Sequence, residues 1–232
     1  MTFPRSLSVT AVAAFGTLAL VAGSGSTLTG QESRGKAALM NPAELKEQAP
    51  DVYKVNFDTS AGQFVIEVQR KWAPIAADRF YNLVKRGFYD DVRFDRVVPG
   101  FVVQFGAMSV DPEITRAFTR PEARIRDDPW PQNQDGSRQV GVQSNKKGFI
   151  AFANSGLNRR TTAMMIHLAD NPSFDEYHTP FGQVVSGMNV LDRLYSGYGD
   201  EIDRTRHAFE GNAYLAKELP KLDYIKMATI AQ

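Results

Sequence analysis

Apolar residues recur at every second position in two runs near residue 60. The runs are Val52–Asp58 and Gln63–Gln69, and the short loop Thr59–Gly62 separates them. The apolar positions are Tyr53, Val55, Phe57, Phe64, Ile66 and Val68. Because successive side chains of a strand point to opposite faces, this spacing predicts a β-hairpin with one buried face.

The period then changes from two residues to that of a helix. Apolar residues at i, i+4, i+7 and i+8 form one stripe, between Pro74 at the start and Gly87 at the end. These residues are Ala76, Phe80, Leu83 and Val84. The pattern predicts a helix, because proline suits a first turn and glycine an end. Similar but shorter patterns predict a second helix over Gly187–Tyr195 and a third around Asn212–Leu219.

Further short apolar runs predict the remaining strands. They are Arg93–Val98, Phe101–Phe105, Gly148–Ala153, Ala163–Leu168, Phe181–Val185 and Leu222–Ile230. Residues 107–147 are polar and rich in proline, and they are interpreted as a long surface loop. Many short strands with two isolated helices indicate a mainly β fold. We expect a closed eight-stranded antiparallel β-barrel capped by two α-helices rather than a parallel α/β sheet.

The N-terminus has the pattern of a secretory signal peptide. Residues 7–22 carry no charge, one arginine precedes them, and small residues follow. The sequence therefore predicts a signal peptide over 1–26, a linker over 27–50 and one folded domain over 51–232. The alternative is an uncleaved membrane anchor, although the run is short for a span of about 20 residues. Either interpretation places the domain outside the cytoplasm, in the periplasm or secreted.

The amino-acid composition excludes several classes of functional site. The 232 residues contain no cysteine, which excludes a disulfide framework, a thiol nucleophile and a thiolate zinc site. The three histidines are far apart in sequence and show no metal-ligand spacing. A net charge of +1 lacks the basic excess typical of nucleic-acid binding. We expect no cofactor, no metal, no nucleic acid partner, and no membrane contact beyond the signal segment.

One segment carries a permanent charge among apolar residues. The stretch FDRVVPGFVVQFG, residues 94–106, holds Arg96 and Gln104 on either side of a Pro-Gly turn. Arg96 could pair with Asp95 or Asp91 at the rim of a barrel, or it could face a site.

Three motifs decide between these interpretations. The segment 94–106 is followed by GFIAFANSG at 148–156 and by FGQVVSGM at 181–188. This set resembles the cyclophilin family of peptidyl-prolyl cis-trans isomerases, over roughly residues 52–232. The chain is most similar to an exported bacterial branch, because it also contains GNAYL at 211–215 and PKLDYI at 220–225.

The resemblance implies the barrel fold and an isomerase that acts on X-Pro bonds of exported polypeptides. It implies that Arg96 is catalytic, and that an apolar pocket with peptide-holding groups surrounds it. The implied substrate-binding residues are Phe101, Gln104, Phe152, Ala153, Asn154, Met165 and His178. The expected partners are proline-containing polypeptide segments, bound by a monomer.

The sequence departs from the family pattern at TTAMMIHL, residues 161–168. Ala163 stands where the family usually has a glutamine that bonds the substrate backbone, and Met165 replaces a pocket phenylalanine. Ser173 and Phe174 lie where many members have a tryptophan. We therefore expect reduced efficiency and weak inhibition by cyclosporin-type ligands. The alternative is a non-catalytic module that binds proline-containing peptides as a chaperone.

Overall fold

The computed structural model describes residues 1, 35–128, 134, 143–153, 155–199 and 201–231. Apart from Met1, the predicted signal peptide lies outside the described residues, so its interpretation stays a prediction. Within the described ranges, no helix combines the length and the apolar character needed to cross a bilayer.

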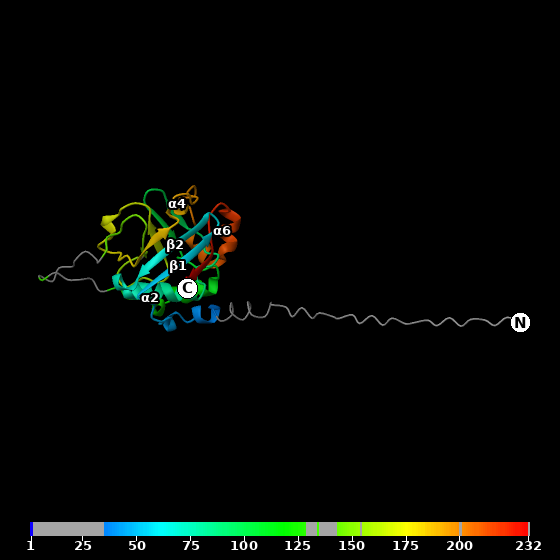
Figure 1. The fold of residues 1–232 in the computed structure, drawn as a ribbon, viewed down its shortest axis with the longest axis horizontal. Coiled ribbons are helices and arrows are strands. Elements are labelled where there is room, and N and C mark those ends of the chain that lie inside the picture. Colours follow the sequence, from blue (N-terminus) through cyan, green and yellow to red (C-terminus); the bar gives the residue numbers. More distant parts are fainter. Residues whose placement is uncertain (2–34, 129–133, 135–142, 154, 200, 232) are drawn as a thin grey trace.

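Among the described residues, eight strands form a single antiparallel sheet that curves around one hydrophobic core (Figure 1). Their hydrogen-bonded order is β3-β4-β6-β5-β7-β2-β1-β8. The strands are β1 (Val52–Thr59), β2 (Gly62–Gln69), β3 (Arg96–Val98), β4 (Val102–Phe105), β5 (Phe149–Phe152), β6 (Met164–His167), β7 (Gly182–Ser186) and β8 (Ile225–Ile230). Each of these strands overlaps one predicted from the sequence.

The predicted hairpin is confirmed with its faces in the expected sense. The pairing of β1 with β2 runs from Val52 opposite Gln69 to Thr59 opposite Gly62. All six of the alternating apolar residues are buried, the most exposed being Tyr53 at 6%. The period-two pattern therefore fixed both the register and the buried face of this pair.

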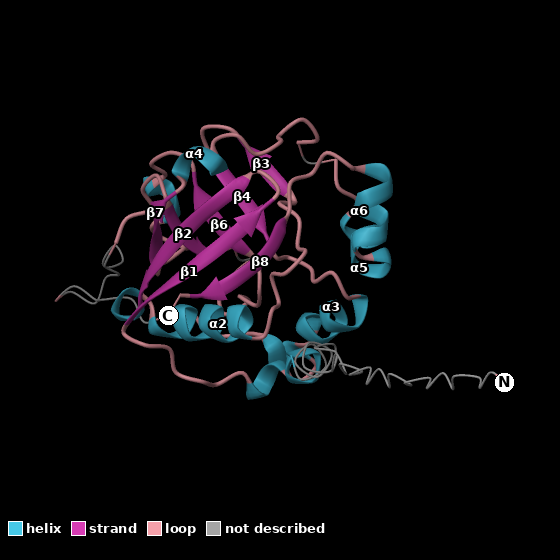
Figure 2. Cartoon of the chain, turned by 45° about the vertical axis from the view of Figure 1, so that its right-hand side comes forward, coloured by secondary structure: helices cyan, strands magenta, loops and turns pink. Residues whose placement is uncertain are grey.

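Closure of the barrel is not confirmed. β3 and β8 are the two ends of the strand order. They meet near their starts, where Arg93 bridges Tyr224, the Phe94 amide donates to the Asp223 carbonyl oxygen over 3.0 Å, and the Ile225 amide of β8 donates to the Val92 carbonyl oxygen over 2.8 Å. The molecule is a curved antiparallel sheet with helices against it (Figure 2).

The helices and single turns of helix lie around this sheet. The α-helices are α2 (Pro74–Lys85), α3 (Pro112–Thr119), α4 (Met188–Leu191), α5 (Arg204–Glu210) and α6 (Asn212–Glu218). The 3₁₀ turns are η1 (Pro42–Glu44), η2 (Arg70–Trp72), η3 (Pro121–Ala123) and η4 (Pro172–Phe174). Helix α2 begins and buries its stripe as predicted, and α6 overlaps the predicted third helix.

Two predictions about helices were wrong in extent. The second helix is only α4, because after Leu191 the backbone tightens into i to i+3 bonds, such as that from the Leu194 amide to the Leu191 carbonyl. The surface loop 107–147 contains α3, whose signal was an N-cap Asp111 followed by Pro112. The Asp111 carboxylate accepts from the Glu113 amide over 2.8 Å.

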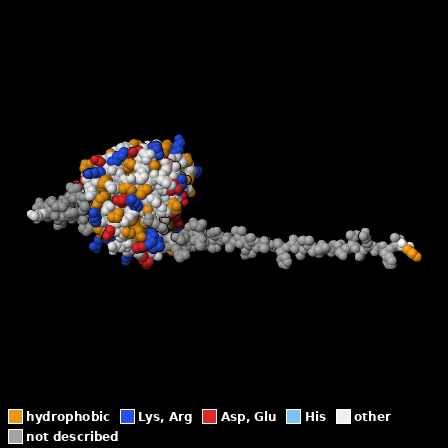
Figure 3. Space-filling model, viewed as in Figure 1, with side chains coloured by type: hydrophobic (Ala, Val, Ile, Leu, Met, Phe, Trp, Pro, Cys, Tyr) orange, Lys and Arg blue, Asp and Glu red, His pale blue; other side chains and the backbone are white. Residues whose placement is uncertain are grey.

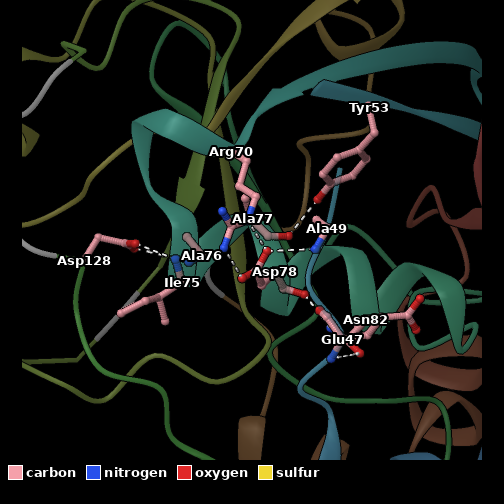
Figure 4. A network of polar contacts seen from close by, with 10 residues as sticks. All are labelled: Glu47, Ala49, Tyr53, Arg70, Ile75, Ala76, Ala77, Asp78, Asn82 and Asp128. Carbon is pink, nitrogen blue, oxygen red and sulfur yellow. Dashed lines mark hydrogen bonds and ion pairs between the residues drawn. The ribbon is translucent and has the colours of Figure 1, made fainter. Parts of the chain in front are cut away.

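The described part of the predicted linker, residues 35–50, packs on the domain. Leu39 is 3% exposed and Ala49 is also 3% exposed, both within the main core. Polar contacts fix this segment along α2 (Figure 4). Asp78 accepts from the Ala49 amide over 2.9 Å, and the Asn82 amide donates to the Glu47 carbonyl over 2.7 Å. Sparse apolar residues concealed this docking, because they follow neither a period of two nor one of 3.6.

Candidate active site

Strand register places three candidate residues in one row across the sheet, with Ala151 as its fourth member. Arg96 on β3 pairs with Gln104 on β4, Gln104 pairs with Met165 on β6, and Met165 pairs with Ala151 on β5. Side chains of directly paired residues lie on the same face of a sheet. The alternate residues of these strands belong to the core: Val97, Val103, Phe105, Met164, Ile166, Ile150 and Phe152. The row therefore lies on the outer face.

Arg96 lies beside the aromatic residue that follows the turn. Its guanidinium carbon is 5.9 Å from the centre of the Phe101 ring, a cation–π contact. Gly100 takes a φ of 71°, which allows the tight turn, and the Phe101 amide donates to the Val98 carbonyl oxygen over 3.0 Å. Arg96 and Phe101 are each half-buried. The turn thus brings a permanent cation and an apolar wall together.

A tight pair between Arg96 and Asp95 is not supported. Asp95 is 8% exposed, and burial raises its pKa to about 6, against the weaker opposing attraction of Arg204 and then Arg96. A close ion pair would lower the pKa of the carboxyl group. Burial, rather than attraction to Arg96, therefore dominates the pKa of Asp95.

Phe174 joins the apolar side of the site, a role that the sequence did not assign to it. Its ring centre is 5.6 Å from that of Phe101, 5.1 Å from His178 and 5.5 Å from His167. The turn η4 positions it, since the Phe174 amide donates to the Asn171 carbonyl over 3.0 Å. Its place near the expected tryptophan was the available signal.

His178 lies against the Phe174 ring, and hydrogen bonds fix both its imidazole and its backbone carbonyl. Its Nδ1 lies 3.0 Å from the Phe152 carbonyl oxygen, and its own carbonyl accepts from the Asn145 side-chain amide over 2.9 Å. A carbonyl oxygen only accepts, so Nδ1 carries the proton. Burial lowers the pKa of His178, against the opposing effect of the bond to Phe152. The ring is therefore neutral at pH 7 and presents Nε2 as an acceptor.

One candidate residue, Phe152, occupies a place other than that expected. Phe152 was expected as a pocket wall, but its side chain is 1% exposed and packs in the core, 5.6 Å from Phe181. Its backbone oxygen contacts the site at His178. Met165 is fully buried, and the side-chain amide of Gln104 lies 3.9 Å from its sulfur. Strand alternation explains why the Phe152 side chain faces the core, since Phe152 pairs with Met164 one position away from the row.

The remaining candidates lie next to a pocket of about 300 Å³. Gln104, Ala153 and Ala163 line it, together with Asp95. The Ala153 amide donates to the Ala163 carbonyl over 2.9 Å, so that amide is not available to a bound peptide. Asn154 falls outside the described residues. Among the residues that are described, no group of three or more His, Asp or Glu is arranged to hold a metal ion.

The family model "Cyclophilin type peptidyl-prolyl cis-trans isomerase/CLD" matches residues 54–210. The chain belongs to this cyclophilin family. The match includes every strand of the sheet except β8, and it ends with α5, so α6 and β8 lie beyond it. The family resemblance expected from the motifs is thus confirmed.

Similar proteins carry isomerase names. Peptidyl-prolyl cis-trans isomerase ppi1 of Schizosaccharomyces pombe is 36% identical over 150 residues, covering 65% of this chain and 90% of that protein. Peptidyl-prolyl cis-trans isomerase CYP18-2 of Arabidopsis thaliana is 34% identical over 154 residues, covering 66% and 87%. These relatives are fungal and plant proteins, so membership of an exported bacterial branch stays a prediction.

Solved structures confirm the fold. The cyclophilin-type isomerase cgd2_1660 of Cryptosporidium parvum matches with a TM-score of 0.55 at 16% identity, covering 78% of this chain and 98% of that one. A second structure of that protein, in the presence of the dipeptide Ala-Pro, matches with a TM-score of 0.55 at 17% identity, covering 77% and 99%.

Proposed function

We propose that this protein is a peptidyl-prolyl cis-trans isomerase that acts on X-Pro bonds of exported polypeptides and assists their folding. The observation that carries the proposal is the placement of Arg96. Strand register sets it beside Gln104 on the outer face, and the turn sets it 5.9 Å from the Phe101 ring. The Phe101 ring would contact the apolar proline ring, and the Arg96 cation would contact the polar backbone next to that ring.

The chemistry follows from the amide bond. Rotation about a peptide bond costs about 18–20 kcal/mol, because conjugation is lost on twisting. In the twisted state the nitrogen lone pair is localised and accepts a hydrogen bond. A donor aimed at that nitrogen binds the twisted state more tightly than either planar state, which lowers the barrier. Arg96 supplies such a donor, and it acts by hydrogen bonding because arginine keeps its proton.

The other groups of the site would hold the peptide. Phe101 and Phe174 form apolar walls for the proline ring, and the neutral His178 offers an acceptor near them. Among the described residues, the side-chain amide of Gln104 has as its partner a sulfur, which is a weak acceptor. Exchanging that contact for a substrate carbonyl therefore costs little.

Ala163 supports the reduced efficiency expected from the sequence. Its side chain has no polar group that could donate to the substrate backbone. One hydrogen bond to substrate is then missing, which weakens binding by about 0.5–1.5 kcal/mol, or about 2- to 10-fold. This same observation favours the second candidate function, a peptide-binding module without catalysis.

Export is the remaining part of the proposal. It rests on the uncharged run at residues 7–22 and the small residues after it. N-terminal sequencing of the protein recovered from its native host tests it. A mature chain that begins near residue 27 supports export to the periplasm or medium, and a chain that retains Met1 contradicts cleavage.

The test of catalysis is the exchange rate of a short Ala-Pro peptide, measured by NMR with the protein and its variants. We expect the protein to accelerate exchange and Arg96→Ala to lose about 10²- to 10³-fold of that acceleration. Arg193→Ala is the matched control, because Arg193 is exposed and lies outside the site. Peptide binding without acceleration would support the binding module instead.

A further inference from the structure

The pocket beside Gln104 contains charges that the proposed isomerisation does not use. Its volume is about 300 Å³, and it shares Gln104 and Ala153 with the candidate site. Neither Arg96 nor Phe101 lines it. Two other arginines do, Arg159 from the loop after β5 and Arg204 from α5. The pocket therefore extends the peptide-binding surface with a second kind of chemistry.

Within the described part of the chain, the two arginines have no fixed anionic partner. Both side chains are exposed, and neither forms a hydrogen bond or an ion pair with a described residue. On the face drawn in Figure 3, basic and acidic side chains are intermixed. Asp95 is the one acid among the described residues that line the pocket, and burial holds its pKa at about 6. The pocket thus keeps an excess of positive charge.

The residues on either side of Arg159 are anchored. Asn158 exchanges two hydrogen bonds of 2.9 Å with Asp127. Arg160 is 4% exposed and donates to the buried carboxylate of Asp128 over 2.8 Å. The stem of Arg159 also passes close to Gly156, because a Cβ added there would lie 3.5 Å from Arg159 Cδ. The loop thereby presents Arg159 with little freedom of the backbone.

Arg204 is positioned by a separate part of the chain. It is the first residue of α5, whose N-cap Asp203 accepts from the Arg206 amide over 2.9 Å. Helix α5 packs beside α3 and α6. Arg204 also lies near enough to Asp95 to oppose the rise of its pKa. Two independent elements thus direct cations to one pocket.

We propose that this pocket binds a carboxylate side chain of the substrate, so that the protein prefers proline-containing segments with an Asp or Glu nearby. The inference rests on the proposed function. Arginine forks match carboxylate oxygens in geometry as well as in charge. The pocket lies one to three strand spacings from Arg96, roughly 5–14 Å. An extended peptide advances about 3.3–3.6 Å per residue, which puts the acid about two to four residues from proline.

The test uses a peptide with one proline and otherwise neutral residues. A single Glu is moved through the four positions on each side of proline, and a Gln peptide accompanies each. NMR exchange gives kcat/KM, and chemical-shift titration gives Kd. We expect one position at which Glu exceeds Gln by about 3- to 10-fold in kcat/KM, since exposed ion pairs are individually weak. The preference should fade toward 1 M salt.

Variants assign the preference to the pocket. Arg159→Gln combined with Arg204→Gln should bring the Glu-to-Gln ratio close to one. Arg193→Gln removes an equal exposed charge elsewhere and should keep the preference. A preference that falls equally in Arg193→Gln would reflect net charge alone and would overturn the proposal.

The outcomes separate the two proposals. Acceleration of every Gln peptide with no Glu preference at any position overturns the pocket and leaves the isomerase intact. No acceleration of any peptide overturns the isomerase, and the Kd values then decide the pocket alone. Equal Kd values for Glu and Gln peptides at all positions overturn it in that case as well.

Discussion

The two ends of the candidate site are built in different ways. At one end, Arg96 and Gln104 occupy paired positions of β3 and β4, so sheet register alone sets them side by side. At the other end, Arg159 comes from a loop and Arg204 from a helix, and no strand pairing relates them. The first end carries the proposed catalytic donor. The second can change its charge without altering the sheet, which makes it the natural place for substrate preference.

The loop end should be the more costly to disturb in stability, because a buried pair anchors it. Asp128 is 3% exposed, and its carboxylate accepts a hydrogen bond from the Ile75 amide of α2 over 2.6 Å (Figure 4). The same carboxylate pairs with Arg160. Asp128→Ala leaves Arg160 buried with one partner fewer. We expect a loss of about 3 kcal/mol or more in the free energy of unfolding, measured by urea denaturation.

Asp127 provides the comparison for that variant. It bonds the neighbouring Asn158 and also lies 3.1 Å from the Arg160 guanidinium, but it is half-buried where Asp128 is buried, so Asp127→Ala should cost less, about 1 kcal/mol. Equal losses in the two variants would contradict the anchoring role given to the buried carboxylate.

Asp95, between the two ends, should show the next largest effect, with the opposite sign. Burial raises the pKa of Asp95 from its ordinary value of 3.8 to about 6. The folded state therefore binds more protons than the unfolded state between about pH 4 and pH 6, and this group's contribution to stability falls as pH rises through that window. Asp95→Asn should stabilise the protein by at most about 3 kcal/mol at pH 7.5.

Measurement at two pH values isolates this contribution. The difference in unfolding free energy between Asp95→Asn and the unsubstituted protein should be much smaller near pH 4, where Asp95 is protonated in the folded state and about half protonated in the unfolded state. A difference that is the same at pH 4 and pH 7.5 would mean that the carboxyl group is not perturbed by burial.

Phe174 tests the apolar wall at the Arg96 end. Its ring contacts Phe101 and His178. An aromatic pair contributes about 0.5–1.5 kcal/mol beyond area burial, so Phe174→Ala should lower kcat/KM for a Pro peptide by about 3- to 10-fold, mainly through KM. Phe209→Ala is the control, because that ring is 72% exposed and lies away from this group. An unchanged KM in Phe174→Ala would remove it from the proposed pocket.

The smallest effect should come from restoring, at Ala163, the glutamine side chain that the family usually has there. Ala163 lines the pocket, which leaves space for a longer side chain. Ala163→Gln should lower KM by about 2- to 10-fold through one new hydrogen bond to the peptide. Ala163→Leu adds similar bulk without the amide, so improvement in both variants would assign the gain to apolar contact instead.

Period-two and helical patterns predicted most of the sheet and α2. Tyr53, Val55 and Phe57 are buried as expected, because alternation along a strand leaves a direct record in sequence. Helix α5 and the docking of residues 35–50 escaped prediction. Their apolar residues are few, and their stability comes from contacts with distant segments, which no local pattern records.

The residues of the candidate site also fall into those that local sequence predicted and those that it did not. Arg96, Phe101 and Gln104 lie within nine residues around one turn, so sequence alone could bring them together. Phe152 was assigned to the pocket although its register points it to the core. Phe174 and the arginines Arg159 and Arg204 were not assigned to a site, because loop and helix positions are related to the strands only by tertiary packing.

The central claim is that Arg96 lowers the barrier to rotation by hydrogen bonding in the twisted state. The most direct test compares Arg96→Ala and Arg96→Lys with the unsubstituted protein, using NMR exchange for the rate and titration for peptide affinity. The account predicts that Arg96→Ala loses about 10²- to 10³-fold in rate while peptide Kd changes little, with Arg96→Lys in between. A rate that falls only in proportion to binding would contradict it, because Arg96 would then stabilise the planar and twisted states alike.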